Sequence, residues 1–322
     1  MQKILFVFLL LSYSIVTAEE PFEFEKPCMG LPVRVLVFCG VKQDAATAAD
    51  AAFKRFDDID AAMSDYRSDS EIVLLTKDAD NDTEPTWRKV SDDVFMVLTE
   101  SKKFYELSDG TFDVTIAPLT RLWRRSRRNN ELPSDELLTK SQTLVGFKFV
   151  ELDEKTKSIR LQKKGIRFDF GGIAKGYALD EAANAVKKTG VKNFLIDAGG
   201  DIVAGGTRDK TSGGWKVAVG EKNNVEEFVN LKDNALAVSG DTFQFVELNG
   251  TRYSHILDPK TGLGVTTPRF AAVRSDNATT ADVLASIMCV LGAKKGIQII
   301  ERLPNTEAMV IENGKREMSS GW

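Results

Sequence analysis

The stretch from Arg167 to Gly206, RFDFGGIAKGYALDEAANAVKKTGVKNFLIDAGGDIVAGG, constrains the fold more than any other part of the chain. Alternating residues predict a short strand over 167–170, and Gly171-Gly172 allow a tight turn. Apolar residues at helical spacing then predict a helix over 173–188, and a second strand is expected over 193–198 before another glycine turn. The stretch therefore combines strands and a helix around two glycine turns.

The first of these turns is a candidate anion site. A turn that leads into a helix presents free backbone N–H groups and the positive end of the helix dipole, which suit a phosphate. Lys175 adds a positive charge in the first helical turn. Glycine turns also serve as simple connectors, because glycine adopts positive φ without strain, and this alternative stays open. The two turns together can place Asp169, Asp197 and Asp201 around one cleft.

The composition fits an ordinary globular protein with a large core. The chain has 322 residues, of which 43% are hydrophobic and 28% charged, so we expect one large domain or two closely joined domains. A net charge of -4 argues against a nucleic-acid binder. The basic run RLWRRSRR at 121–128 is the exception, either as a solvated helix end or as a docking patch for an acidic partner.

The N-terminal residues predict export. Residues 1–18 contain a lysine, an apolar run and a Val16-Thr17-Ala18 end, which together are typical of a cleaved signal peptide. Residues 19–27 are expected to form a polar leader, and the domain is expected to begin at Cys28. An uncleaved segment would act as an anchor, although the apolar run is short for spanning a bilayer.

The cysteines do not indicate a disulfide framework or a zinc site. Cys28, Cys39 and Cys289 make an odd number, so at least one is free. An extended strand over 31–38 would hold Cys28 and Cys39 too far apart for a bridge.

Outside this stretch, helices follow a first strand before residue 150, and short strands followed by two helices are expected after residue 206. Asn249-Gly250 is a strong hairpin signal, so antiparallel pairing is expected there. Asp44 is a candidate N-cap for the first helix. The main helices are expected over 44–64, from Ser70, over 90–108, from 132, over 281–291 and over 294–302, with a hairpin between 145 and 166.

A candidate metal site lies in the segment TTADVLASIMCVLG. If Thr279 or Thr280 caps this helix, Asp282 and Ser286 lie one turn apart on the same face. A carboxylate and a hydroxyl suit a hard cation such as Mg²⁺, and the turn at Gly171-Gly172 can supply a carbonyl. The alternative is that Asp282 interacts with the helix dipole and Ser286 bonds back to the Asp282 carbonyl.

Two further side chains are candidates for chemistry or binding. His255, in RYSHILDPKTG, is the chain's single histidine and lies at a strand end before a turn. It can act as a general base near neutral pH, but a lone histidine at a rim is also often structural. Tyr66 lies in a loop, where it either stacks on a planar ligand or is a half-buried loop aromatic.

Six segments together resemble the FAD:protein FMN transferase (ApbE) family: MSDYRSDSEI, DGTFDVTIAPLTRLW, DFGGIAKGYALD, LIDAGGDI, YSHILDPKTG and TTADVLAS. They run in family order from about Cys28 to the C-terminus. The resemblance implies an α+β fold over 28–322, a single domain with mixed, largely antiparallel sheets packed by helices. It also implies Mg²⁺-dependent cleavage of FAD, with FMN attached through a phosphoester to a Thr or Ser of a target protein and AMP released. Some members hydrolyse FAD to FMN and AMP instead.

The resemblance assigns roles to individual residues. The metal positions fall on the carbonyl of Gly172 and on Asp282 and Ser286, and His255 matches the base that deprotonates the acceptor hydroxyl. Asp197 and Asp201 are assigned structural support. Leu31 and Ser286 stand where threonine is usual in the family, and serine keeps the oxygen that a metal needs. The positions that match FAD contacts are Met29, Tyr66, Thr111, Phe112, Asp113, Asp169, Lys175 and Ile256.

The resemblance further implies a periplasmic location, FAD and an acceptor protein as partners, no nucleic acid, and a peripheral association with the inner membrane through membrane-bound targets. Three alternatives remain at this point: an FAD pyrophosphatase, a non-catalytic FAD-binding protein, and a docking module built on the 121–128 patch.

Overall fold

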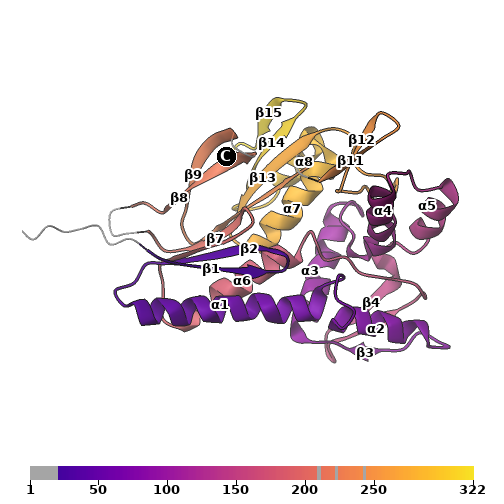
Figure 1. Ribbon diagram of the computed structural model, residues 1–322, viewed down its shortest axis with the longest axis horizontal. Helices are drawn as coiled ribbons and strands as arrows, with labels where there is room; N and C mark the ends of the chain where they lie inside the picture. Colours follow the sequence, from indigo (N-terminus) through magenta and orange to yellow (C-terminus); the bar gives the residue numbers. More distant parts are fainter. Residues whose placement is uncertain (1–20, 209–211, 222–223, 242–243) are drawn as a thin grey trace, which may run out of the picture.

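An antiparallel sheet of eight strands forms the centre of the computed structural model, which describes residues 21–208, 212–221, 224–241 and 244–322 (Figure 1). The strand order is β1-β2-β6-β7-β10-β13-β14-β15, and each neighbouring pair is antiparallel. The predicted signal peptide lies outside the described residues. The strands are β1 Phe22–Cys28, β2 Leu31–Val37, β6 Phe194–Ala198, β7 Asp201–Gly205, β10 Ala235–Gly240, β13 Arg269–Ser275, β14 Glu307–Glu312 and β15 Lys315–Met318.

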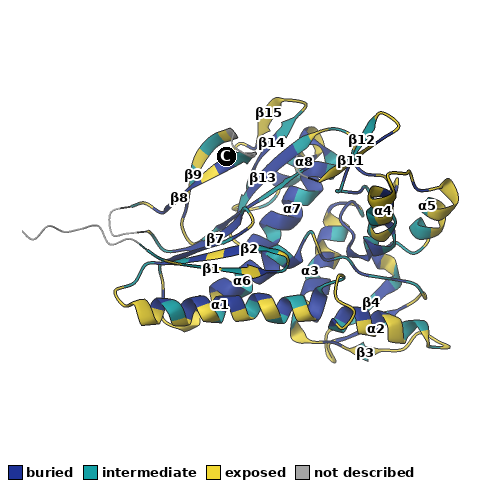
Figure 2. Cartoon of the chain, in the orientation of Figure 1, coloured by how far each residue is buried: buried dark blue, intermediate teal, exposed yellow. Residues whose placement is uncertain are grey.

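Both faces of this sheet are covered. Helices α1 (Lys42–Met63), α6 (Ala174–Lys188) and α7 (Ala278–Leu291) pack on one face, and the hairpin of β8 (Trp215–Glu221) and β9 (Asn224–Leu231) packs on the other. Because side chains alternate along a strand, neighbouring residues enter different cores. In β6, Phe194 and Ile196 join the helix-side core and Leu195 joins the hairpin-side core. Coverage on both faces explains the nearly continuous apolar runs in the inner strands β6, β7 and β13, which are mostly buried (Figure 2).

A second group of elements lies at one end of the sheet, on the right in Figure 1. Its helix α4 (Ala117–Asn129) contacts the strand β12 (Thr251–Ser254) and the turn that follows it. The Trp123 ring lies 5.1 Å from the Tyr253 ring, and Trp123 Nε1 donates to the Gly262 carbonyl at 2.7 Å. The elements are α2 Glu71–Asp80, α3 Asp92–Leu107, α4 Ala117–Asn129, α5 Asp135–Gln142, β3 Arg88–Lys89, β4 Val150–Asp153, β5 Ser158–Leu161, β11 Phe245–Leu248 and β12 Thr251–Ser254.

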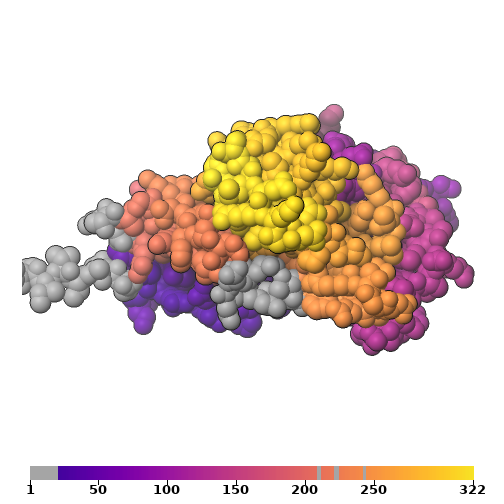
Figure 3. All heavy atoms as spheres, turned by 90° about the horizontal axis from the view of Figure 1, so that it is seen from above, coloured from indigo at the N-terminus to yellow at the C-terminus, as the bar shows by residue number. Residues whose placement is uncertain are grey.

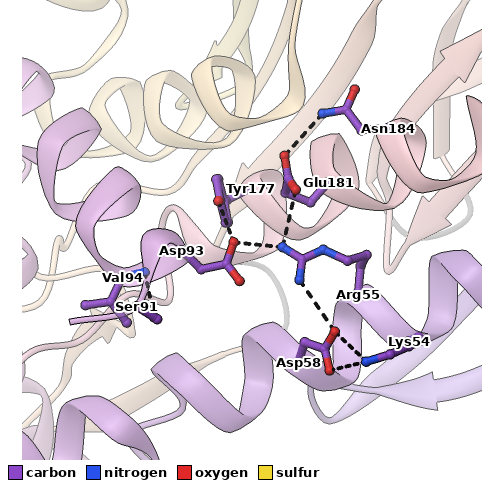
Figure 4. A network of polar contacts seen from close by, with 9 residues as sticks. All are labelled: Lys54, Arg55, Asp58, Ser91, Asp93, Val94, Tyr177, Glu181 and Asn184. Carbon is purple, nitrogen blue, oxygen red and sulfur yellow. Dashed lines mark hydrogen bonds and ion pairs between the residues drawn. The ribbon is translucent and has the colours of Figure 1, made fainter. Parts of the chain in front are cut away.

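A polar network joins α1, α3 and α6 (Figure 4). Arg55 Nη2 and Tyr177 OH both donate to Asp93 Oδ1, at 2.7 and 2.8 Å, and Arg55 also pairs with Glu181. Burial raises the pKa of Tyr177, and the hydrogen bond to Asp93 raises it further, so the phenol remains a donor. The network therefore fixes α6 at Tyr177, which is two residues after Lys175.

The C-terminal residues close the hairpin side of the molecule. Helix α8 (Ala293–Ile300) follows α7, and the chain then returns through β14 and β15. Trp322 Nε1 and Arg316 Nη2 each donate to Glu227 Oε1 at 2.5 Å. Figure 3 shows the C-terminal segment, in yellow, beside the β8–β9 hairpin.

The structure confirms the α+β class with antiparallel sheets and corrects several element boundaries. The predicted leader is wrong from Phe22 onward, because FEFEKPC pairs with β2 as an edge strand, where Pro27 is tolerated. The predicted strand at 167–170 is also wrong. This segment is a loop in which Asp169 N donates to the Val114 carbonyl, and its alternating Phe168 and Phe170 side chains are buried against the core.

Two predicted helix caps are wrong as well. Helix α1 begins at Lys42 after Val41, which makes no side-chain cap, and Asp44 lies in the first turn. Helix α7 begins at Ala278, and its cap is Asn277, whose side chain accepts from Thr280 N at 2.8 Å. Strand β13 was not predicted at all, although it is an interior strand of the sheet, paired with β10 and β14.

The structure shows no disulfide bond among the three cysteines, and its described helices are not of the membrane-spanning kind. None of Cys28, Cys39 and Cys289 forms a disulfide bond, which agrees with the prediction that the sequence contains no disulfide framework. Within the described ranges, no helix combines the length and apolar character needed to cross a bilayer.

Candidate active site at the junction of α6 and α7

The glycine turn before α6 lies against α7. A Cβ atom placed on Gly172 would lie 3.3 Å from Ser286 Oγ and 3.2 Å from the Phe112 ring. The approach of the two helices is closer still at Gly176, where a Cβ would lie 2.4 Å from the Ala278 carbonyl oxygen. Glycine at 176 is therefore required for the contact that brings the predicted metal residues together.

The backbone at this junction leaves one carbonyl without a partner. In a regular helix Gly176 N would donate to the carbonyl of Gly172, four residues earlier. Here Gly176 N donates to Asp282 Oδ2 instead, at 3.0 Å, while the neighbouring carbonyls of Phe170 and Ile173 both accept helical N–H groups. Within the described part of the chain, the Gly172 carbonyl accepts no hydrogen bond.

Ser286 also keeps a free oxygen. The alternative in which its hydroxyl bonds back to the Asp282 carbonyl is wrong, since Ser286 Oγ makes no hydrogen bond to any described residue. Ser101, in α3, shows the usual behaviour, because its Oγ donates to the carbonyl of Val97 at 2.6 Å. The hydroxyl of Ser286 is therefore available to another ligand.

Asp282 is buried at a position that disfavours its negative charge. Burial, followed by the charge of Asp201, raises the pKa of Asp282 to about 7, while Lys175 and the Gly176 N–H act in the opposite direction. Among the described residues, its carboxylate accepts one hydrogen bond, on Oδ2. A cation at Oδ1 would relieve this unfavourable charge.

Carbonyl, carboxylate and hydroxyl oxygens are ligands that suit Mg²⁺. Gly172, Asp282 and Ser286 supply one of each, and the structure leaves all three with unused acceptor capacity. Across residues 21–208, 212–221, 224–241 and 244–322, no cluster of three or more His, Cys, Asp or Glu side chains could hold a metal. The three oxygens fit a hard cation, whose remaining coordination positions water or a bound substrate would fill.

Lys175 contributes the positive charge of the site. Its Nζ lies 2.8 Å from Asp201 Oδ2, and Asp201 is fully buried at the start of β7. Burial lowers the pKa of Lys175, but Asp201 and Asp282 outweigh burial and raise the pKa above its usual value. Lys175 is therefore charged, as a phosphate ligand must be.

His255 is oriented as a base. Its backbone N and its Nδ1 both lie near the Gln244 carbonyl oxygen, at 2.9 and 3.0 Å. A carbonyl only accepts, so Nδ1 carries the proton and Nε2 keeps its lone pair. Burial lowers the pKa of His255, and the positive charges of Arg127 and Lys175 also act to lower it.

Tyr66 and Asp169 share a partner that sequence reasoning missed. Arg124 Cζ lies 4.1 Å from the centre of the Tyr66 ring, and Arg124 also contacts Asp65 and Asp169. Arg124 belongs to the 121–128 patch, which was expected to be a solvated helix end or a docking patch. The one available signal was its position next to Trp123, at the border of the apolar face of the helix.

Among the other predicted FAD contacts, Phe112 is the one that contacts the glycine turn. Met29 is in the tight turn between β1 and β2, at φ 51°, and Ile256 directly follows His255. Phe112 packs against Phe104 and borders Gly172, and Thr111 is buried beside it.

Asp113 has a role inside the fold. It caps the short helix 114–116 and accepts from Thr115 N, Thr115 Oγ1 and Phe147 N. Its contact with FAD stays a prediction.

The carboxylates expected around one cleft have separate partners. Asp169 accepts from Gly171 N, and Asp197 accepts from Gly200 N and Arg34, so both stabilise the glycine turns that they precede. Asp180 in α6 was not predicted. It accepts from the N–H groups of Ala278 and Thr279 and fixes the start of α7. Its partners are distant in the sequence, so no local signal could have revealed it.

Known proteins resemble this chain over most of its length. The profile of the ApbE family matches residues 29–310. A protein of Vibrio cholerae named FAD:protein FMN transferase is 29% identical over 287 residues, which cover 86% of this chain and 84% of the relative. A protein of the same name from Haemophilus influenzae is 30% identical over 256 residues, covering 76% and 72%. The solved structure of the flavin transferase ApbE from Vibrio cholerae superposes with a TM-score of 0.83 at 26% identity, over 94% of this chain and 98% of the other.

Proposed function

This chain belongs to the ApbE family, and from this premise we propose that it transfers FMN from FAD to a Thr or Ser hydroxyl of an acceptor protein, with the help of Mg²⁺. The observation that carries the proposal is the set of three oxygens at the junction of α6 and α7. The Gly172 carbonyl comes from the turn before α6, the Asp282 carboxylate and the Ser286 hydroxyl come from α7, and all three have unused acceptor capacity.

The residues at the junction would have two roles, which are metal binding and phosphate binding. Gly172, Asp282 and Ser286 would hold Mg²⁺, which supplies charge neutralisation for the pyrophosphate of FAD. Lys175 would leave Asp201 in part and share its charge with a phosphate oxygen. Asp201 is buried and keeps the ammonium group near this position before the substrate arrives.

His255 would remove the proton of the acceptor hydroxyl. The acceptor oxygen then bonds to the phosphorus of the FMN half while the bond from that phosphorus to the bridging oxygen breaks. AMP leaves with the bridging oxygen, and the proton stays on His255 Nε2 until solvent removes it. The hydrogen bond between Nδ1 and the Gln244 carbonyl supports this direction of proton transfer.

Water in place of the acceptor hydroxyl would give FMN and AMP, so hydrolysis is the second candidate. It uses the same residues, and transfer is favoured by the names of the relatives. We further propose that the chain acts after export to the periplasm, which the sequence of residues 1–18 supports. Acceptors anchored in the inner membrane would then bring the chain to that membrane only through their own anchor.

Mass spectrometry of the products tests the function. The purified chain is incubated with FAD and an acceptor protein of the Vibrio cholerae flavin transferase, with Mg²⁺ or with EDTA. We expect the acceptor to gain one FMN phosphoester and AMP to form in equal amount, only with Mg²⁺. Free FMN and AMP without a modified acceptor would favour hydrolysis, and intact FAD would favour a flavin carrier.

A further inference from the structure

Arg124 links two segments that sequence reasoning treats separately. Tyr66, in the loop between α1 and α2, is 81% exposed, which is unusual for a large aromatic residue. The guanidinium of Arg124 lies over this ring, with Cζ 4.1 Å from its centre. One side of the ring therefore has a charged planar partner, and most of the remaining surface is open.

The guanidinium is itself held by two carboxylates. Arg124 Nη1 lies 2.6 Å from Asp65 Oδ2, Nη2 lies 3.3 Å from Asp65 Oδ1, and Nη2 also lies 3.3 Å from Asp169 Oδ2. The Asp65 side chain is only 6% exposed and that of Asp169 13% exposed. A fork of this kind fixes the plane of the guanidinium, which a lysine ammonium cannot do.

The two carboxylate partners of Arg124 argue against a role for its guanidinium in binding the pyrophosphate. Two carboxylates contact one guanidinium, so this group of three side chains carries a net negative charge when both acids are ionised. A phosphate would be repelled by it, whereas an uncharged planar ring on Tyr66 would not. Arg124 is therefore suited to orienting side chains rather than to binding the pyrophosphate.

Helix α4 is also fixed from its other side. Trp123, the residue before Arg124, donates to the Gly262 carbonyl and packs against Tyr253 in β12, the strand that leads to His255. The position of Arg124 is therefore set by the same helix that anchors the segment of the predicted base.

We infer that Arg124 is a positioning residue for the substrate, which holds Tyr66 flat so that its open face stacks on the planar ring of FAD and which holds Asp169 beside it. This inference rests on the proposed function, because it takes FAD as the planar ligand. The guanidinium pre-organises a ring that would otherwise sample several rotamers, and a pre-organised platform lowers the entropy cost of binding. The contact is remote from the reacting phosphorus, so it contributes equally to the ground state and the transition state.

The test compares Arg124→Lys, Tyr66→Ala and the double variant, with Arg128→Gln as the matched control. Arg128 is exposed in the last turn of α4 and pairs with no described residue. The dissociation constant of FAD is measured by calorimetry in EDTA, and KM and kcat are measured separately with Mg²⁺. Because a cation over an aromatic ring contributes modestly, we expect Arg124→Lys to raise both the dissociation constant and KM by about tenfold with little change in kcat.

The double variant shows whether Arg124 affects FAD binding through Tyr66 or only by stabilising the loop that carries Tyr66. If Arg124 acts through Tyr66, the double variant binds FAD about as weakly as the weaker single variant, because the two effects are not additive. Fully additive losses, or unchanged FAD affinity in Arg124→Lys, would overturn the inference. Arg124→Gln combined with Asp65→Asn removes the guanidinium together with the charge of its less exposed partner, and it must show the same loss of affinity even if Arg124→Lys unfolds.

The binding measurement also separates this inference from the proposed function. Wild-type protein that binds FAD without transferring FMN would contradict the function, while the variants would still report on Arg124. Wild-type protein that does not bind FAD would overturn both.

Discussion

At the scale of single residues, the site depends on polar atoms whose usual partners are missing. Gly176 N donates to Asp282 rather than to the Gly172 carbonyl, and Ser286 does not bond to its own helix. An unpaired acceptor beside a buried carboxylate is costly unless a ligand completes it. Ser286 is the most conservative position at which to test the role of these acceptors, because Ser286→Ala removes only the hydroxyl oxygen.

We predict that Ser286→Ala weakens metal use while Ser286→Thr preserves it. Loss of even an outer-shell partner costs about 10- to 100-fold in metal affinity, so Ser286→Ala should raise the Mg²⁺ concentration for half-maximal transfer by at least about tenfold. Ser286→Thr keeps the oxygen and serves as the control. Equal Mg²⁺ dependence of all three proteins would remove Ser286 from the site.

His255 gives a prediction about pH. Burial lowers its pKa below the ordinary value of 6.5, so the neutral, proton-accepting form persists as the pH falls below that value. We expect the acidic limb of kcat/KM to have its midpoint below 6.5. His255→Ala should lower kcat by about 10²- to 10⁴-fold, remove this limb and leave FAD affinity unchanged. An acidic limb that survives in His255→Ala would assign the base to another group.

The helix that carries Asp282 and Ser286 was predictable because its signal is local. The spacing of Asp282 and Ser286 placed both on one face of α7, because helix periodicity needs only the neighbouring sequence. The roles of Arg124 and Asp180 were not predicted, because their partners are separated from them by many residues in the sequence. The exposure of Tyr66 was not predictable either, because it depends on how the loop packs against α4, which is distant in the sequence.

At the scale of elements, the close contact of α6 with α7 sets the geometry of the site. Gly176→Ala should force the helices apart, because its Cβ would lie 2.4 Å from the Ala278 carbonyl oxygen and 2.9 Å from Asp282 Cβ. We expect a loss of about 1–3 kcal/mol in the free energy of unfolding, together with weaker Mg²⁺ dependence. Denaturant titration measures the first and transfer assays the second.

Gly40→Ala is the control for this substitution. A Cβ at Gly40 meets nothing within 4 Å and its φ is not positive, so its stability and activity should match the wild type. If Gly176→Ala behaves in the same way, the contact between α6 and α7 does not hold the site.

The elements that sequence analysis missed are those stabilised mainly by distant partners. Strand β1 contains two charged residues and a proline on its exposed side, and it forms because β2 offers an unpaired edge. The loop at 167–170 alternates like a strand, yet its phenylalanines are buried by packing against the core rather than by sheet pairing. Period-two alternation reports burial on one face and does not report hydrogen bonding.

At the scale of the whole molecule, the buried carboxylate links stability to pH and to metal. In the unfolded chain Asp282 has an ordinary pKa of 3.8, and in the folded chain its pKa is about 7. The folded state therefore binds more protons between these values, so its stability falls as the pH rises through this window. A bound divalent cation would stabilise the ionised form and cancel the loss.

We predict that, in EDTA, the free energy of unfolding falls between about pH 5 and about pH 8 by about 1–4 kcal/mol more in the wild type than in Asp282→Asn. Mg²⁺ should restore the wild type at the higher pH and have no effect on Asp282→Asn. Denaturant titrations at both pH values measure this. Identical pH dependence of the two proteins would show that Asp282 is not the group responsible.

Direct titration with Mn²⁺ as a paramagnetic substitute for Mg²⁺ tests the central claim. Electron paramagnetic resonance measures the free ion while the full chain is titrated in the presence of FAD. If Gly172, Asp282 and Ser286 hold one divalent ion, the wild type and Ser286→Thr remove one equivalent of Mn²⁺ from solution, and Asp282→Asn removes none at the same concentration. Retention of one equivalent by Asp282→Asn would contradict the site at the junction of α6 and α7.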